Sequence, residues 1–322
     1  MKTQLPEKWI DAEAGEKPAA VAVRTLQNRL SVVRKLLPAA AKSARKDVEQ
    51  VHQLRVWTRR TITAVKLYED LLPRRRYAWM KKQLRNIRQA ANDARDRDVL
   101  MAWLQNNLFR CGAKRWLKKI KAERRQSQES ILAVHRQLSR GGRFKRRINR
   151  LLQHVHGLSE ELGPPTTEFG EWSREHLRHV VEIFFAALPS DERDPQALHR
   201  FRICGKELRY TLELLAGAFS ESLKSEIYPI IEALADRLGK VNDVATAIEW
   251  LRPTLESATN PRKAAEWQDL LNFEQGEFER ARLAFWDWWS PQRRQDLRDA
   301  FATVLKPSPA SQSVDTNRHQ TE

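Results

Sequence analysis

Residues 51–60 read Val-His-Gln-Leu-Arg-Val-Trp-Thr-Arg-Arg, and residues 198–206 read Leu-His-Arg-Phe-Arg-Ile-Cys-Gly-Lys. His52 and His199 are 147 positions apart, as are Arg55 and Arg202. At the same shift, residues 95–104 lie over residues 242–251, which pairs Asp96 with Asp243 and Trp103 with Trp250. Two separated segments in one register indicate an internal duplication.

Each of the two stretches, taken as an α-helix, carries a row of cations beside an apolar face. The apolar faces comprise Val51, Leu54, Thr58, Thr61, Val65, Tyr68 and Leu72, and then Leu198, Phe201, Gly205, Leu208, Leu212, Leu215 and Phe219. The cationic rows comprise His52, Arg55, Arg59 and Lys66, and then His199, Arg202, Lys206 and Arg209. A single row of this kind is typical of a solvated helix face. Two rows in a duplicated frame, each headed by a histidine, favour a site that grips an anion.

These residues resemble the signature of the CHAD family, the conserved histidine α-helical domain. The resemblance rests on His followed by Arg at +3 and by Arg or Lys at +7, and on the runs Ala94–Val99, Lys206–Tyr210 and Leu238–Asp243. It extends from about Val21 to about Leu305. It implies two pseudo-symmetric helical bundles around a basic central cavity. It also implies binding of inorganic polyphosphate and association with polyphosphate granules.

The charge of the chain is strongly uneven. Residues 1–163 hold 38 basic and 15 acidic side chains, a net charge of +23, whereas residues 164–322 hold 20 and 26, a net charge of −6. An excess of this size repels itself unless anions neutralise it, so it predicts a polyanionic partner. Net charge alone does not separate nucleic acid, anionic lipid and polyphosphate.

The candidate polyphosphate-binding residues come from both copies and from the helix after the first. They are His52, Arg55, Arg59, Arg60, Lys66, Lys81, Arg85, Arg88, His199, Arg202, Lys206, Arg209 and Arg24. Lys81, Arg85 and Arg88 share one face through steps of four and three residues. Arg provides a planar fork for phosphate oxygens and Lys a flexible point charge. An imidazole beside a polyanion favours its protonated form, so affinity is expected to fall as pH rises through the histidine range.

The pattern predicts an all-α fold in four segments. Residues 1–18 are a flexible lead-in, 19–163 and 164–305 are the two helical repeats, and 306–322 are a disordered tail. Pro38 is expected to close the first helix, and Asp47 to cap the second. Breaks are also expected at residues 92–95, between Leu238 and Asp243, at Gly141-Gly142 and at the hinge 163–167. Some of the cations Arg143, Lys145, Arg146, Arg147 and Arg150 are candidates for the cavity wall, as is the triplet 74–76 for its mouth.

Signatures of enzymes and of bound cofactors are missing from the sequence. It has no Walker loop, no Gly-x-Ser-x-Gly, no His-Glu-x-x-His and no Cys-x-x-Cys, so we expect neither catalysis nor a cofactor. His176 and His179, with Glu175 and Glu182, have a spacing compatible with a metal site, but no second ligand set accompanies them. The two cysteines, Cys111 and Cys204, show no paired spacing, and no apolar run has transmembrane length. A cytoplasmic protein without membrane contact is expected.

Three functional classes stay open at this point. A polyphosphate-binding protein is favoured by the repeated motifs. A protein that binds RNA or DNA through the same basic surface is the alternative, although the sequence lacks the known motifs that recognise nucleic acids. A phosphohydrolase that uses Asp96, Asp98 or Asp243 comes third, because such aspartates more often cap helices or hold arginines in place. Oligomeric state is not predicted.

Overall fold

The protein is described by a computed structural model that covers residues 5–43, 48–111, 114–160 and 167–306. Most of these residues form α-helices and short helical turns, and none of them forms a β-strand, which confirms the all-α prediction. The first helices are α1 (Pro18–Ser43), α2 (Glu49–Leu67), α3 (Arg74–Cys111), α4 (Lys114–Ser139) and α5 (Arg143–Glu160). The later helices are α6 (Phe169–Ala186), α7 (Pro195–Leu215), α8 (Tyr228–Glu256), α9 (Pro261–Trp288) and α10 (Pro291–Val304).

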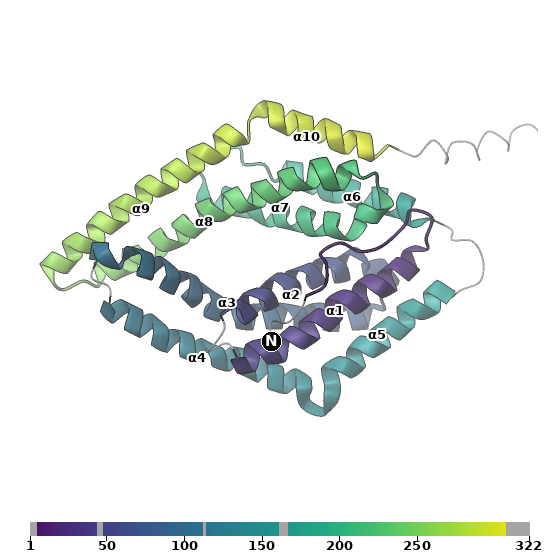
Figure 1. The fold of residues 1–322 in the computed structure, drawn as a ribbon, viewed down its shortest axis with the longest axis horizontal. Helices are drawn as coiled ribbons and strands as arrows, with labels where there is room; N and C mark the ends of the chain where they lie inside the picture. The colour runs from purple at the N-terminus through teal and green to yellow at the C-terminus, as the bar shows by residue number, and fades with distance from the viewer. Residues whose placement is uncertain (1–4, 44–47, 112–113, 161–166, 307–322) are drawn as a thin grey trace, which may run out of the picture.

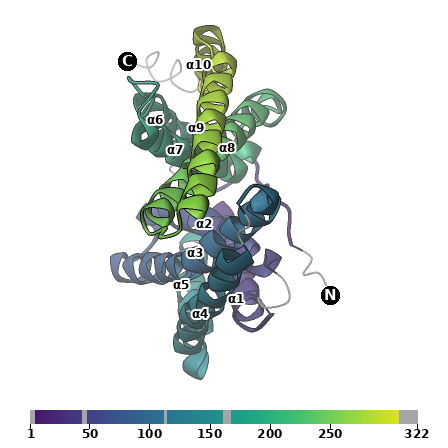
Figure 2. The same ribbon diagram turned by 90° about the vertical axis from the view of Figure 1, so that its left-hand side faces the viewer.

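The helices are arranged in two groups that follow the chain. Figure 1 shows α1–α5 in the lower part of the molecule and α6–α10 in the upper part, and the turned view in Figure 2 shows the same division. Within the groups, α1 packs on α2, α2 on α3 and α3 on α4, and likewise α6 packs on α7, α7 on α8 and α8 on α9. The groups meet where α2 contacts α7 and where α3 contacts α9. We call the α2–α7 contact the seam.

The apolar stripes read from the sequence form the inner faces of α2 and α7. Every residue of the first stripe is buried, and so is every residue of the second except Phe219, which is half-buried. These faces join one core that contains residues of both groups, among them Leu54, Val65, Phe201 and Leu208. A smaller core lies where the far ends of α3, α4, α8 and α9 meet, and there the Trp103 and Trp250 rings contact edge to face at 5.8 Å.

Three predicted helix breaks were wrong, because core packing outweighs the local signals. Helix α1 continues through Pro38, since Leu36, Leu37 and Ala40 on the same segment are buried. Helix α3 runs through residues 92–95, where Ala91 and Ala94 are fully buried. Helix α8 runs through residues 238–243 in the same way, with Leu238 and Val241 buried. The predicted break at Gly141-Gly142 is confirmed, with φ angles of 56° and 65°.

Residues 5–17 are not helical, but they pack against the fold instead of lying loose as the sequence suggested. The backbone N–H of Ile10 donates to the carbonyl of Glu213 at 3.3 Å. The fully buried guanidinium of Arg29 donates to the carbonyls of Glu7 and Lys8. A buried guanidinium needs acceptors, and this segment provides them.

Three predictions fall wholly or mostly outside the described residues. These are the Asp47 cap, most of the hinge 163–167 and the tail after residue 306. Within the described ranges, none of the helices combines the length and the apolar character required to cross a lipid bilayer.

Candidate anion-binding site

A basic pocket of about 300 Å³ lies along the seam, between α2, α3 and α7. Seven of the thirteen predicted site residues line it: Arg55, Arg59 and Lys66 from α2, Arg88 from α3, and His199, Arg202 and Lys206 from α7. Its other lining residues are Ile62, Thr63, Asn92, Ile203, Glu207 and Tyr210. Three members of each cationic row thus face one hollow, those of the first row from α2 and those of the second row from α7.

Helix periodicity explains why these side chains converge. Arg55 and Arg59 are four residues apart on α2, and Arg202 and Lys206 have the same spacing on α7, so each pair occupies one face. The buried stripes turn those faces towards each other. Gly205 allows α7 to approach α8, because a Cβ there would stand 2.8 Å from Cδ2 of Leu234. The cations are therefore positioned by the core and not by flexible loops.

Two of the lining cations are neutralised within the protein. Arg55 pairs with Asp96 of α3 at 3.1 Å, and Lys66 pairs with Glu207 of α7 at 2.7 Å. Arg59, Arg88, Arg202 and Lys206 make no ion pair with any residue that the structure describes. The Nε of Arg202 is buried without a hydrogen-bond partner there. The pocket therefore holds more positive charge than its own carboxylates balance.

The pKa values of several lining cations are lowered, in agreement with this excess of positive charge. Burial, followed by the nearby charges of Arg202 and Arg59, lowers the pKa of Lys206 to about 7. Burial and then Arg59 likewise lower the pKa of Arg88, and burial is the main cause of the lowered pKa of Arg202. Each shift reflects cations held together away from water, so an anion in the pocket would be favoured.

Two of the three motif aspartates, Asp96 and Asp98, form ion pairs with arginines. Asp98 is buried and accepts a bond of 2.6 Å from Nε of Arg124. Asp96 holds Arg55, as described above. Burial raises the pKa of Asp243, although Arg202 and Lys206 act in the opposite direction. No ion pair joins Asp243 to either cation among the described contacts, whereas Asp96 pairs with Arg55.

The two motif histidines differ in position. His199 is exposed, lines the pocket, and its Nδ1 lies 2.6 Å from Oδ1 of Asn242. His52 is half-buried and does not line this pocket. Burial, and then the charge of Arg95, lowers the pKa of His52.

Five further predicted residues lie outside the pocket. Arg60 and Arg209 contact the buried carboxylate of Glu213, at 2.7 and 3.7 Å. Arg24 pairs with Glu16 at 2.7 Å, and Arg85 is exposed on α3 without lining the pocket. Lys81 donates to the Tyr77 hydroxyl and lines the neighbouring pocket instead. Sequence reasoning missed Asn92 and Tyr210, which follow Arg88 and Lys206 by four residues.

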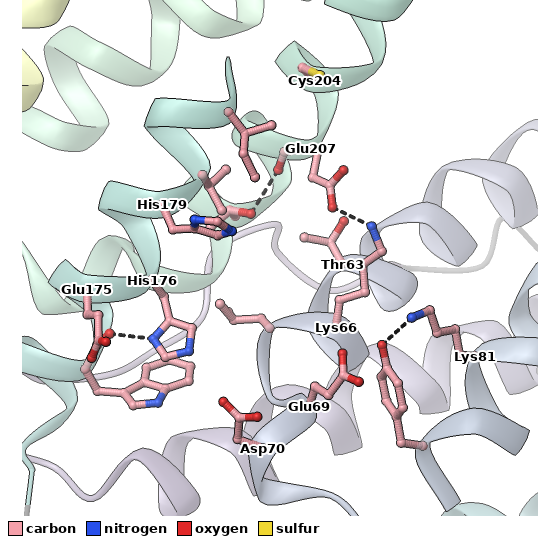
Figure 3. A pocket seen from close by; sticks show the side chains of 16 residues that line it. Thr63, Lys66, Glu69, Asp70, Lys81, Glu175, His176, His179, Cys204 and Glu207 are labelled. Atoms are coloured by element: carbon pink, nitrogen blue, oxygen red, sulfur yellow. Dashed lines mark hydrogen bonds and ion pairs between the residues drawn. The ribbon is translucent and has the colours of Figure 1, made fainter. Parts of the chain in front are cut away.

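A larger pocket of about 810 Å³ adjoins the basic one, and the two share Thr63, Lys66 and Glu207. Figure 3 shows Glu69, Asp70, Glu175 and Glu207 around it, together with His176 and His179. The Lys66–Glu207 pair lies between the two pockets. Among the described residues, no group of three or more His, Cys, Asp or Glu side chains is arranged to hold a metal ion, so His176 and His179 lack the partners that such a site needs.

Comparison with known proteins identifies one family and several solved structures, including the following two. The family profile described as CHAD domain matches residues 24–252. The crystal structure of the CHAD domain from the plant Ricinus communis has a TM-score of 0.61 and 22% identity, covering 93% of this chain and 97% of that one. PptA from Streptomyces chartreusis has a TM-score of 0.59 and 17% identity, covering 84% and 98%. No curated protein matches the sequence.

Proposed function

The chain belongs to the CHAD domain family, which is linked to polyphosphate binding, and from this premise we propose that it binds inorganic polyphosphate in the basic pocket. We propose binding without catalysis, and without a cofactor or metal. The protein would thereby associate with polyphosphate granules.

One observation carries the proposal: Arg59, Arg88, Arg202 and Lys206 converge on one pocket without carboxylate partners among the described residues. Partly buried cations that repel one another are costly unless an anion joins them. Phosphate oxygens accept bidentate bonds from Arg and single bonds from Lys. A chain of linked phosphates would meet cations from α2, α3 and α7 at once, so both halves of the protein would hold one ligand.

The lining of the pocket favours polyphosphate over nucleic acid. Sequence-tolerant binding of single strands relies on aromatic side chains on which bases stack. The aromatic side chain in the lining, Tyr210, is buried, and the guanidinium groups of Arg60 and Arg209 lie over its ring. A ligand without bases fits such a wall better.

The arrangement of the helices also supports an internal duplication, with repeats at about residues 19–163 and 164–305. The succession of contacts from α1 to α4 recurs from α6 to α9. Trp103 and Trp250, which the 147-residue shift makes equivalent, touch each other. Equivalent residues meet in this way near a two-fold axis. We therefore propose two pseudo-symmetric bundles around the seam.

Direct binding to labelled polyphosphate tests the proposal. Labelled long-chain polyphosphate is titrated with the wild type and with a pocket variant, Arg202→Gln with Lys206→Gln. A matched control, Arg252→Gln with Arg262→Gln, removes the same charge from exposed positions of α8 and α9. The pocket variant should bind at least about ten-fold more weakly than the control, because each lost charge-assisted bond contributes about 1.5–3 kcal/mol.

Other outcomes would assign another function. If single-stranded RNA displaces polyphosphate at lower phosphate concentration than the reverse, the ligand is nucleic acid. If phosphate is released in the presence of a divalent metal, and this release is lost in Asp96→Asn, the protein is a phosphohydrolase. If the pocket variant and the control bind polyphosphate with equal affinity, the basic pocket is not the binding site.

A further inference from the structure

A second group of cations gathers at the turn between α4 and α5. A hollow of about 250 Å³ at this turn is lined by arginines alone, namely Arg140, Arg143, Arg146, Arg147 and Arg150. Arg76 of α3 adjoins it through a smaller hollow that it shares with Arg147 and Arg150. We call these six residues the arginine turn cluster. The cluster contains Arg143, Arg146, Arg147 and Arg150, which were expected as candidates for the cavity wall, and Arg76, which was expected at the cavity mouth.

The cluster lies away from the seam. The α4–α5 turn is at the bottom of the molecule in Figure 1, and Figure 2 also shows it at the end opposite α6–α10. Arg76 and Arg88 are twelve residues apart on α3, about 18 Å along the helix and about 120° around it. An anion in the basic pocket therefore does not reach the cluster along one face of α3.

Three of the six guanidinium groups have a contact within the protein, and none of the six is neutralised by a described carboxylate. Nη1 of Arg76 donates to the carbonyl of Arg150 at 2.7 Å, and Nη1 of Arg146 donates to the carbonyl of Gly141. The Arg147 guanidinium lies 5.3 Å from the centre of the Trp79 ring. None of the six arginines has a carboxylate partner within the described residues. Guanidinium groups that have no carboxylate partner are suited to phosphate oxygens.

The start of α5 is electrostatically unfavourable while the hollow is empty. The helix begins at Arg143 and has no acidic residue in its first turn. Cations oppose the positive end of the helix dipole, and like charges three or four residues apart, such as Arg143 with Arg146 and Arg147, repel. The positive φ angles of Gly141 and Gly142 bring Arg140 back beside this helix end. An anion bound here would attract each of these positive groups and so offset the repulsion between them.

The lining favours a phosphate chain over a nucleic acid. The aromatic residue here, Trp79, packs against Phe144 with 6.4 Å between ring centres, and Arg147 covers it. No other aromatic side chain lines either hollow. We infer that the arginine turn cluster is a second binding site for linked phosphates, so that one protein holds two segments of polyphosphate. This inference rests on the proposed function, and it adds a site that the seam does not contain.

Calorimetry with inorganic tripolyphosphate separates the two sites. The turn variant carries Arg143→Gln, Arg146→Gln, Arg147→Gln and Arg150→Gln. Its control removes the same charge elsewhere, with Arg252→Gln, Arg262→Gln, Lys263→Gln and Lys306→Gln, all at exposed positions. The wild type and the control should bind two molecules per chain, whereas the turn variant should bind one with unchanged affinity at the pocket. The pocket variant should retain the turn site.

The two proposals fail in different ways. A turn variant that binds as much tripolyphosphate as its control overturns the second site and leaves the basic pocket intact. A pocket variant without any loss overturns the proposed function alone. A short RNA duplex that binds the cluster more tightly than tripolyphosphate would overturn the assignment to phosphate chains.

Thermal unfolding provides an independent readout. Without phosphate, the turn variant should melt above the wild type, since the repulsion at the start of α5 is removed. Tripolyphosphate should then raise the Tm of the wild type more than that of the turn variant. A turn variant that melts below the wild type, or equal shifts in the two proteins, would contradict the inference.

Discussion

Arg60 of α2 and Glu213 of α7 form a two-point ion pair across the seam, with Nε–Oε2 at 2.7 Å and Nη2–Oε1 at 2.9 Å. The Glu213 side chain is fully buried and also accepts a bond of 3.0 Å from the Tyr228 hydroxyl. The planar fork of Arg60 fixes both the distance and the register of the two helices. The basic pocket is lined by the same two helices, so its shape depends on this pair.

Replacement of Glu213 should therefore destabilise the protein strongly. Glu213→Gln keeps the shape of the side chain but leaves the half-buried Arg60 guanidinium without its counter-charge. Removing one partner of a buried ion pair typically lowers the free energy of unfolding by about 3–5 kcal/mol. Urea unfolding followed by circular dichroism measures this loss.

The Lys66–Glu207 pair offers a matched control on the same two helices. Its atoms are 2.7 Å apart, but the side chains are 39% and 41% exposed. Exposed pairs contribute about 1 kcal/mol or less, so Glu207→Gln should change the free energy of unfolding little. Losses of similar size in Glu207→Gln and Glu213→Gln would show that burial of the Arg60–Glu213 pair does not matter.

Gly205→Ala should separate α7 from α8. The added Cβ would stand 2.8 Å from Cδ2 of Leu234, and both positions are buried. Overpacking of this kind costs about 1–3 kcal/mol. At Gly239 in α8 a Cβ meets nothing within 4 Å, so Gly239→Ala should instead stabilise the helix by about 0.5–1 kcal/mol. Two variants that shift the urea midpoint in the same direction would refute this account of Gly205.

The sequence predicted the inner faces of α2 and α7 well, because burial follows helical periodicity directly. Positions such as Leu54 and Val65 recur on one face of the helix, and the structure buries them. The same periodicity placed Arg59, Arg202 and Lys206 beside those faces, and the packing then brought them to one pocket. Local spacing sufficed wherever a residue's environment depends on its own helix.

The sequence failed where the environment depends on another segment. Arg60 and Arg209 look like further members of the cationic rows, but Glu213 engages both, and no local pattern reveals that partner. Helix α3 continues through residues 92–95 because Ala91 and Ala94 pack into the core, which outweighs the polar residues around them. Arg143 and its neighbours form their own cluster because the Gly141-Gly142 turn gathers them where α4 ends and α5 begins, at the far end of the molecule from α6–α10.

Affinity for polyphosphate should fall as pH rises through the histidine range. Burial, and then the charge of Arg95, lowers the pKa of His52 below its usual value of 6.5 in the free protein. A polyanion that extends from the basic pocket to His52 would favour its imidazolium form, so binding would take up protons and be strongest at acidic pH. Titrations from acidic to mildly alkaline pH should give a flatter profile below about pH 6.5 for the His52→Ala, His199→Ala double variant. Superimposable profiles would reject the role of the histidines.

At higher pH, Lys206 should take up a further proton when polyphosphate binds. In the free protein its pKa is lowered from 10.5 to about 7 by burial and by neighbouring cations, so the amine is largely neutral at pH 8. A bound polyanion favours the ammonium form and raises this pKa. The contribution of Lys206 to affinity should therefore be fully developed below about pH 7 and should weaken as pH rises above it.

The free energy of unfolding without ligand should instead rise as pH increases above about 7. This opposite trend distinguishes the titration of Lys206 from a general loss of positive charge. The unfolded chain binds the Lys206 proton up to about pH 10.5, whereas the folded protein releases it near pH 7, so folding becomes more favourable between these values. Lys206→Arg keeps a positive charge that does not titrate in this range, so it should remove both pH dependences. Calorimetry at pH 8 in buffers of different ionisation enthalpy should show proton uptake on binding in the wild type and not in Lys206→Arg. Equal proton uptake in the two proteins would mean that another group titrates on binding.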